Sequence, residues 1–321
     1  MYIAGQIKER IKKIVISKRN IRKKTVDITD LEELVYDTRR IKTVELAGRN
    51  ESYRHATILK KYAGIEQSRI LNLAIEHGVC RYEKNLFIHD MIYHAPLIIR
   101  ETTRRKYLEE VWKKEVHIIG PYIAYAEPFY TEKRMCQEKE KNGRTLLVFP
   151  AHSTAVTQTQ FNEDEFIKEI ERLKSGFDTV MVCLYYIDVQ KGYVKFLENR
   201  GYKVVCAGNG NDVLFLSRLR TIIELSDAVM TNDEGSTVSN VVYYNKPCYI
   251  YNQNLNIKAE AYHSIHYLPK NEHTKQMIQL FSKDDFILTE EQKQFCNDLY
   301  GYDQVKSKEE MREFLLQHSK M

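Results

Sequence analysis

Residues 232–237, with the sequence Asn-Asp-Glu-Gly-Ser-Thr, have the composition of a ligand-binding turn. The apolar run 228–231 before them predicts a strand, and the run 236–244 after them predicts a helix. A turn that ends a strand and opens a helix favours an anion, because the first helical amides lack partners and the helix dipole is positive there. Gly235 would let a phosphate approach the backbone, and Ser236 could cap the helix or face the anion. An ordinary strand–turn–helix joint explains the same residues equally well.

Polar side chains and glycines also follow other predicted strands in this half of the chain. Two apolar runs, 144–149 and 202–207, end just before such groups. Because the carboxyl ends of parallel strands meet at one edge of a sheet, we expect these groups to line one crevice. Amides, hydroxyls and an imidazole would hold the phosphates, ribose or base of a nucleotide, whereas plain turns are the alternative. The residues expected to line this crevice are His152, Ser153, Thr154, Asn209, Gly210, Glu234, Gly235, Ser236 and Thr237.

A general base is predicted in the first half of the chain. The run 68–76 predicts a buried strand, and His77 follows it directly before a glycine. An imidazole has a pKa near neutrality and therefore suits general-base catalysis. Asp90 is the second candidate for the base, and a histidine that only hydrogen-bonds in a turn is the alternative for His77. The spacing of His89, Asp90 and His94 matches no strong metal motif, so no metal site is predicted.

The elements that must position these residues alternate regularly from residue 144 onwards. Short connections and apolar strands predict a parallel sheet covered on both faces, an α/β domain of Rossmann-like type. No G-x-G-x-x-G follows its first strand and no Walker motif occurs, which disfavours a nicotinamide or flavin cofactor and a Walker ATPase. Strands are expected at 144–149, 179–186, 202–207, 228–231 and 247–251, with helices at 162–176, 189–200, 213–225 and 236–244.

The first half is less regular, and the charged run 131–143 is expected to be a linker with a helical part. In the helix at 103–114 the only tryptophan, Trp112, is expected to pack, and Arg218 and Arg220 are expected at a solvated helix edge. After Tyr251 the chain is expected to be irregular until two terminal helices. The remaining elements are helices at 30–36, 52–64, 103–114, 290–300 and 307–317, and strands at 68–76, 86–88 and 116–119.

Composition limits the class of protein. The net charge of +5 suits an anionic ligand or membrane face but is too small to indicate nucleic-acid binding. The six cysteines form no C-x-x-C pair, and several lie in apolar runs, as free buried thiols do in a reducing cytoplasm. No apolar run is long enough for a transmembrane helix. Residues 1–24 form a basic amphipathic segment, either a solvated helix or tail or a contact with an anionic leaflet.

Several stretches resemble bacterial glycosyltransferases of the GT-B architecture, in particular those of capsule and surface-polysaccharide synthesis. The similarity extends over about residues 70–250 and is strongest from 144 onwards. Asn245 stands where these enzymes usually have glycine, and Ala151 and Ser153 interrupt a Pro-His-Pro-like turn. The similar stretches are Ser226-Asp227-Ala228-Val229-Met230-Thr231-Asn232, Tyr244-Asn245-Lys246-Pro247-Cys248, Glu76-His77-Gly78-Val79 and Pro150-Ala151-His152.

The resemblance implies two Rossmann-like domains with parallel sheets that face each other across a cleft. Residues 1–130 would form the acceptor-side domain, 131–143 a linker, and 144–321 the nucleotide-donor domain with its terminal helices packed back. The implied activity is metal-independent transfer of a sugar from a nucleotide-activated donor to a glycan or lipid-linked acceptor, with no cofactor. The enzyme would be cytoplasmic, and its N-terminus could contact the inner face of the membrane.

Three other activities fit the same architecture. The first is transfer of a polyol phosphate from a CDP donor, which would use a similar pair of histidines. The second is 2-epimerisation of a nucleotide sugar, which would need more carboxylates and arginines in the cleft. The third is a non-catalytic module that binds a nucleotide sugar.

Overall fold

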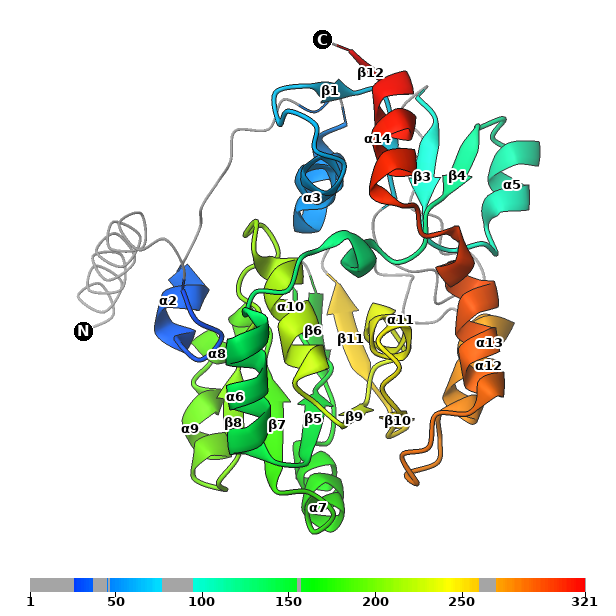
Figure 1. Cartoon of the computed structure of the whole chain (residues 1–321). Helices are drawn as coiled ribbons and strands as arrows, with labels where there is room; N and C mark the ends of the chain where they lie inside the picture. The colour runs from blue at the N-terminus through cyan, green and yellow to red at the C-terminus, as the bar shows by residue number, and fades with distance from the viewer. Residues whose placement is uncertain are drawn as a thin grey trace, which may run out of the picture.

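The computed structural model describes residues 26–36, 45, 47–76, 95–154, 157–259 and 270–320. Its largest element is a five-stranded parallel sheet in the lower part of Figure 1, here called the large sheet, with the order β10-β9-β5-β7-β8. The first of these strands along the chain is the central one. The next two lie on one side of it, and the last two lie on the other side. The strands are β5 (Thr145–Phe149), β7 (Thr179–Cys183), β8 (Lys203–Val205), β9 (Ala228–Thr231) and β10 (Cys248–Ile250). The strand order therefore reverses between β5 and β9, which is the order of Rossmann-like folds.

Both faces of the large sheet are buried, as its apolar strands require. Alternate residues of β5 enter different cores: Leu146 and Val148 pack with one set of helices and Leu147 with the other. The helices on the first face are α7 (Glu163–Lys174) and α9 (Tyr193–Glu198), and those on the second face are α10 (Phe215–Glu224) and α11 (Ser236–Tyr243). The predicted α/β class with parallel strands is confirmed.

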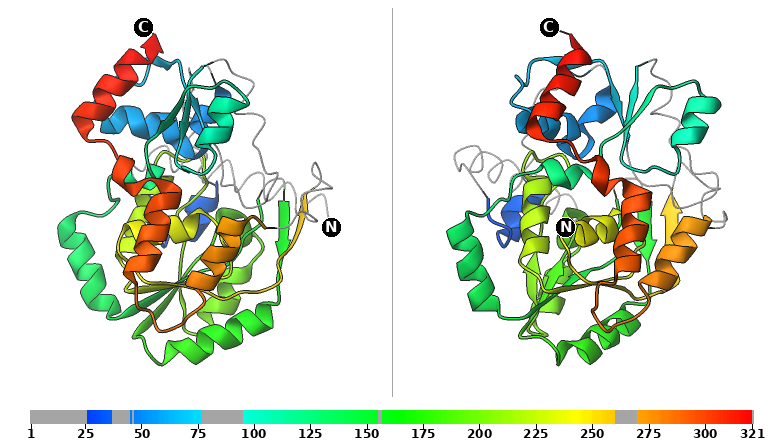
Figure 2. Two further views of the ribbon diagram at one scale, coloured as in Figure 1. Left: turned by 90° about the vertical axis from the view of Figure 1, so that its right-hand side faces the viewer. Right: turned by 45° about the vertical axis from the view of Figure 1, so that its right-hand side comes forward.

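Two predictions within this part need correction. The helix expected over 189–200 is two short helices, α8 (Tyr186–Gln190) and α9, because Gly192 between them has φ 83°. The stretch after Tyr251 is also more regular than expected. It contributes β11 (Asn256–Ala259), which pairs antiparallel with β6 (Thr157–Gln160) in a ribbon that stands beside the large sheet in the left view of Figure 2.

A smaller parallel sheet lies in the upper part of Figure 1, here called the small sheet. Its strands are β2 (Ala74–Ile75), β3 (Leu97–Ile99) and β4 (Val116–Ile118). The helix α5 (Arg105–Glu110) covers one face through Leu108. The other face packs with α3 (His55–Tyr62) and α14 (Lys308–Gln317). Trp112 is 41% exposed beside α5, so the prediction that it packs inside was wrong.

The strand expected over 68–76 is divided. Ile75 and its neighbour form β2, whereas β1 (Ile70–Leu71) leaves the small sheet and pairs antiparallel with β12 (Ser319–Lys320) at the end of the chain. The helix α6 (Glu132–Asn142) begins at the expected linker, where the Thr131 side chain accepts a hydrogen bond from the Arg134 amide.

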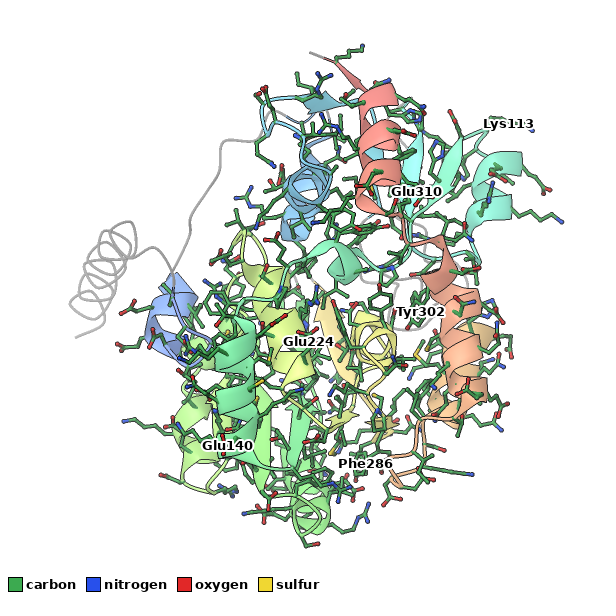
Figure 3. The ribbon with its side chains drawn as sticks, in the orientation of Figure 1. Lys113, Glu140, Glu224, Phe286, Tyr302 and Glu310 are labelled. Carbon is green, nitrogen blue, oxygen red and sulfur yellow. The ribbon has the colours of Figure 1, made fainter. Side chains whose placement is uncertain are left out.

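The first described helix packs near the large sheet, and the last one packs near the small sheet. In the N-terminal segment, α2 (Leu31–Tyr36) lies against α8 near the large sheet. The C-terminal segment runs upwards through α13 (Glu290–Tyr300) and η4 (Tyr302–Gln304) to α14, which contacts α3. Tyr302, labelled in Figure 3, donates a hydrogen bond from its hydroxyl to the Ser239 carbonyl on α11 at 2.6 Å. Ahead of this run lies α12 (Glu272–Leu280), which was not predicted.

One apolar core connects the two parts. It contains residues from α3 and the small sheet together with residues from the large sheet, α10, α13 and α14. Four of the cysteines, Cys183, Cys206, Cys248 and Cys296, are buried free thiols, as expected, and Cys136 is an exposed one. Within the described residues, none of the helices combines the length and apolar composition needed to cross a bilayer.

Candidate functional site

The loops after β5 and β9 lie side by side at the carboxyl edge of the large sheet. The two strands are neighbours with Phe149 opposite Thr231, so both chains leave the sheet together. Asn232 joins the loops, because its Oδ1 accepts a hydrogen bond from the Ala151 amide at 2.6 Å. Its Nδ2 donates to Gln253 beyond β10 at 3.1 Å. Asn232 is 2% exposed, so this amide fixes three loops of one edge together.

The helix α11 begins at this edge without a capping side chain. Its N-cap residue is Gly235, whose backbone is extended at φ −95° and ψ −161°. Ser236 and Thr237 are the first helical residues, and both side chains are half-buried. The prediction of a strand–turn–helix joint at 228–244 is confirmed. Since Gly235 can offer no side-chain acceptor, the first amides of α11 are suited to an anion or to water.

Glu234 is the acid nearest to this helix start, and it is 6% exposed. Lys270 forms an ion pair with it, with Nζ 2.9 Å from Oε1. A buried carboxylate without a partner would repel a phosphate at the same edge, and the lysine offsets that charge. Lys270 was not singled out from the sequence, where it follows an irregular stretch 36 positions after Glu234 with no motif between them.

On the β5 side, His152 is exposed and its ring lies on Tyr185, with centroids 4.4 Å apart. Its carbonyl oxygen accepts a hydrogen bond from the Thr159 hydroxyl at 2.9 Å, which ties the loop to the β6–β11 ribbon. Tyr185 follows β7, so the imidazole leans towards that strand, and α11 starts on the opposite side of β5. His152 and Ser236 therefore belong to one edge and flank β5 from different sides.

Ser153 and Thr154 have local partners. The buried Ser153 hydroxyl oxygen accepts from the Thr159 amide at 3.2 Å and from Lys191 Nζ at 2.9 Å. The Thr154 hydroxyl oxygen accepts from the Thr157 amide at 3.0 Å. Thr154 thus shapes the turn into β6, whereas Ser153 holds a cation, Lys191, beside His152. Lys191, which the sequence did not single out, also pairs with Asp188, with Nζ 3.0 Å from Oδ1, so Asp188 offsets its charge.

The loop after β8 is covered by the chain from the small-sheet part. A Cβ atom on Gly210 would lie 2.8 Å from Cε1 of Tyr53 and 3.4 Å from the Tyr185 hydroxyl. The Asn209 side chain accepts a hydrogen bond from the Asn211 amide at 2.9 Å. Gly210 is therefore a contact surface for Tyr53, and Asn209 stabilises its own turn. Burial raises the pKa of the Tyr185 phenol well above its usual value.

The covering chain is the 3-10 turn η1 (Gly48–Arg54), and its end is strained. Tyr53 and Arg54 have φ 50° and 59°, a left-handed conformation that costs free energy in residues other than glycine. Arg54 Nε donates to the Asn211 carbonyl at 2.6 Å. Two successive left-handed residues held against the β8 loop indicate a contact that the rest of the fold enforces.

A row of rings continues from Tyr53 to the strand ends of the small sheet. His55 lies 5.9 Å from Tyr53 and 4.0 Å from Tyr122, measured between ring centroids. The Tyr122 hydroxyl donates to the Glu76 carbonyl at 3.3 Å. Glu76 directly follows β2, so the row connects the carboxyl end of β2 with the carboxyl end of β8.

Glu76 is fully buried and belongs to a charged cluster with Arg100 and Arg104. Its carboxylate accepts a hydrogen bond from the Arg100 amide at 3.0 Å and forms an ion pair with Arg104. Burial lowers the pKa of Arg104 to about 10. Buried charges at strand ends often belong to functional sites. The predicted base His77 is the next residue after Glu76, but His77 and Asp90 both lie outside the described residues.

One expectation about charge was wrong. Arg218 does not lie at a solvated helix edge: it is fully buried, and its guanidinium pairs with Asp212 at 2.8 Å. It also donates to the Val26 carbonyl at 3.1 Å and thereby fixes the N-terminal segment. Arg220 is half-buried and donates to the Ala126 carbonyl at 2.7 Å.

Comparison with known proteins adds no family to this description. No protein-family model matches the chain, and no curated protein sequence matches it significantly. The functional proposal therefore rests on the geometry of the carboxyl edge together with the sequence resemblance.

Proposed function

We propose that the protein is a GT-B-type glycosyltransferase that moves a sugar from a nucleotide-activated donor to a glycan or lipid-linked acceptor. The observation that carries the proposal is the edge between β5 and β9, where Asn232 holds the His152 loop beside the uncapped start of α11. In parallel α/β sheets, ligands bind where the strand order reverses, and a helix start there favours phosphate.

In this proposal the donor's phosphates lie over the first amides of α11, near Ser236 and Thr237. His152 and Lys191 would supply further hydrogen-bonding groups from the β5 side. When the acceptor oxygen attacks the anomeric carbon, the bond to the phosphate oxygen breaks and negative charge grows on the leaving nucleotide. Fixed amides stabilise that charge without reorganisation. Glu234, which pairs with Lys270, would accept a hydrogen bond from a hydroxyl of the donor.

The acceptor's proton must go to a base, and we propose that the small-sheet part supplies it. The row from Tyr53 to Tyr122 links its strand ends to the β8 loop, which supports an arrangement with the acceptor side opposite the donor edge. His77 follows Glu76 at the end of β2 and remains the proposed base.

Donor binding is tested first, by thermal unfolding with UDP-, GDP-, CDP- and CMP-linked sugars. One donor at 100 times its dissociation constant should stabilise the protein by about 2.7 kcal/mol. We expect His152→Ala and Ser236→Ala each to weaken the response to that donor, and His273→Ala, an exposed histidine on α12, to leave it unchanged. If no donor stabilises the protein, or both site variants respond like the parent, the proposed donor site is wrong.

Catalysis is tested separately with His77→Gln. Donor binding should persist while transfer is lost, because the imidazole acts only on the acceptor's proton. Retained transfer would remove His77 from the mechanism but leave the donor site intact.

A further inference from the structure

A second cluster of side chains that could bind a metal ion lies in the small-sheet part. It contains residues of β4 and a residue that follows α14. Glu115 and His117 are two positions apart in and beside β4, so they point to the same side of the small sheet. His318 follows α14 as its C-cap residue. One ligand atom from each of the three residues lies within 4.8 Å of the other two.

One pair in the cluster has the separation of two metal ligands. Nε2 of His117 lies 3.2 Å from Oε1 of Glu115. At this distance a straight hydrogen bond would form, yet the buried Nε2 makes no hydrogen bond within the described part of the chain. The nitrogen therefore points beside the oxygen. Two ligands of one tetrahedral zinc ion, with bonds of about 2.0–2.1 Å, are themselves about 3.3 Å apart and point to a third position in the same way.

The two imidazoles are held by regular structure on both sides. His117 pairs with Ile98 in the small sheet. The His318 amide donates to the Phe314 carbonyl at 3.2 Å, and its carbonyl accepts from the Asn72 amide at 2.7 Å. The Phe314 ring lies 4.9 Å from each imidazole and forms an apolar wall beside them. Such supports orient metal-binding histidines and limit their freedom before the ion arrives.

We propose that Glu115, His117 and His318 form a binding site for a divalent transition-metal ion, with Zn²⁺ as the natural fit. Two imidazoles and a carboxylate are a common zinc ligand set, and water would complete the coordination. The ion would connect β4 with the residue that precedes β12, and so fasten the C-terminal segment to the small sheet. A structural role follows from this position, because binding only to the folded state adds to its stability.

A cation lies near the proposed ion. Lys306 Nζ is 5.5 Å from the centre of the Phe314 ring, which borders both imidazoles. Only Glu115 provides a negative charge among the three ligands. Replacing Lys306 by glutamine should therefore strengthen binding of the metal ion. Metal bound by surface histidines elsewhere on the protein would not respond to this substitution.

The test is titration of the EDTA-treated full chain with Zn²⁺ by calorimetry and with Co²⁺ by visible absorption. One equivalent should bind, and the Co²⁺ complex should show the absorption of a low-coordinate site. His117→Ala and His318→Ala should each weaken binding at least about tenfold, since even outer-sphere partners of metal ligands contribute that much. His273→Ala is the matched control and should bind as the parent does.

Thermal unfolding is measured in parallel, as the midpoint temperature of the protein with and without Zn²⁺. The parent should be stabilised by Zn²⁺, and the histidine variants should lose that increment. If His117→Ala fails to fold, His318→Ala still decides the question, because its ring lies at the end of the chain. Absence of binding, or one-equivalent binding that survives both substitutions, would overturn the proposal without touching the proposed transferase.

Discussion

At the level of single residues, the buried Arg218 of the large-sheet part has a structural role. Arg218 lies on α10 and pairs with Asp212 where neither side chain is exposed. It also donates to the carbonyls of Val26 and Ala207, so one guanidinium joins the N-terminal segment to the β8 loop. A buried ion pair often adds no stability over an apolar pair, but losing one partner leaves an uncompensated charge.

Asp212→Ala should therefore lower the free energy of unfolding by about 3–5 kcal/mol, because it strands the Arg218 charge inside the protein. Urea denaturation followed by circular dichroism measures the loss. The matched control is Arg105→Ala, which removes an exposed pair with Glu109 and should change stability by at most about 0.5 kcal/mol. Equal effects of the two substitutions would mean that water reaches the Asp212–Arg218 pair.

The partners of single residues could be predicted from the sequence only where they lie close in the chain. Asn162 was expected to start a helix, and its side chain does accept from the Glu165 amide, because capping depends on residues close in the chain. Arg218 was misplaced because its partner Val26 lies 192 positions away. Asn232 was read as part of the turn, but nothing in the sequence indicates that its amide bridges to the loop of a strand 81 positions earlier.

At the level of elements, the contact between η1 and the β8 loop connects the two parts of the molecule near the proposed donor edge. Tyr53 lies on Gly210, and its ring is also 5.4 Å from Phe215 on α10. A glycine is required at this place for close approach and not for an unusual backbone angle. Asn209 and Gly210 were expected to line a nucleotide; in the structure Gly210 contacts Tyr53, and the Asn209 side chain accepts a hydrogen bond from the Asn211 amide.

Gly210→Ala should destabilise the protein by about 1–3 kcal/mol, because the added methyl group would lie 2.8 Å from the Tyr53 ring. The cost should fall by at least about 0.5 kcal/mol when Tyr53 is also replaced by alanine, since the two side chains compete for one space. Denaturation of the single and double variants measures the coupling.

Gly176→Ala serves as the control, because a Cβ atom there meets only the Leu173 carbonyl at an ordinary 3.5 Å. Purely additive effects of the Gly210 and Tyr53 substitutions would show that η1 does not press on the β8 loop in solution.

Element prediction succeeded where local patterns decide and failed where distant pairing decides. The helix α13 was expected at 290–300 and lies there, since Thr289 and Gln292 form a complete capping box. β6 was not expected, because Thr-Gln-Thr-Gln lacks apolar residues and becomes a strand only through its pairing with β11. The strand over 68–76 was divided because Leu71 pairs with Ser319 at the far end of the chain.

At the level of the whole molecule, the ends of the chain bind the two parts together. The N-terminal segment packs near the large sheet, and α14 packs on α3 near the small sheet. The shared core includes Leu59 of α3, Leu315 of α14 and Ile222 of α10. A core that continues through both parts favours one cooperative unit over two independently folding domains.

We therefore expect a single thermal unfolding transition in which the calorimetric and van't Hoff enthalpies agree. Leu315→Ala should move the whole transition, with a loss of about 2–5 kcal/mol, because this fully buried side chain leaves a cavity between α14 and the core. Trp112 is the only tryptophan and lies near the small sheet, so its fluorescence follows that part while circular dichroism follows the entire chain.

The two signals should coincide in the parent and in Leu315→Ala, because the core transmits the damage to the large sheet. Leu316→Ala is the matched control: its side chain is 38% exposed on the same helix, so its removal should cost less than about 1 kcal/mol. If Trp112 fluorescence changed at a lower temperature than circular dichroism in Leu315→Ala, the small-sheet part would be unfolding alone. The ends of the chain would then hold two separate domains together without making them one cooperative unit.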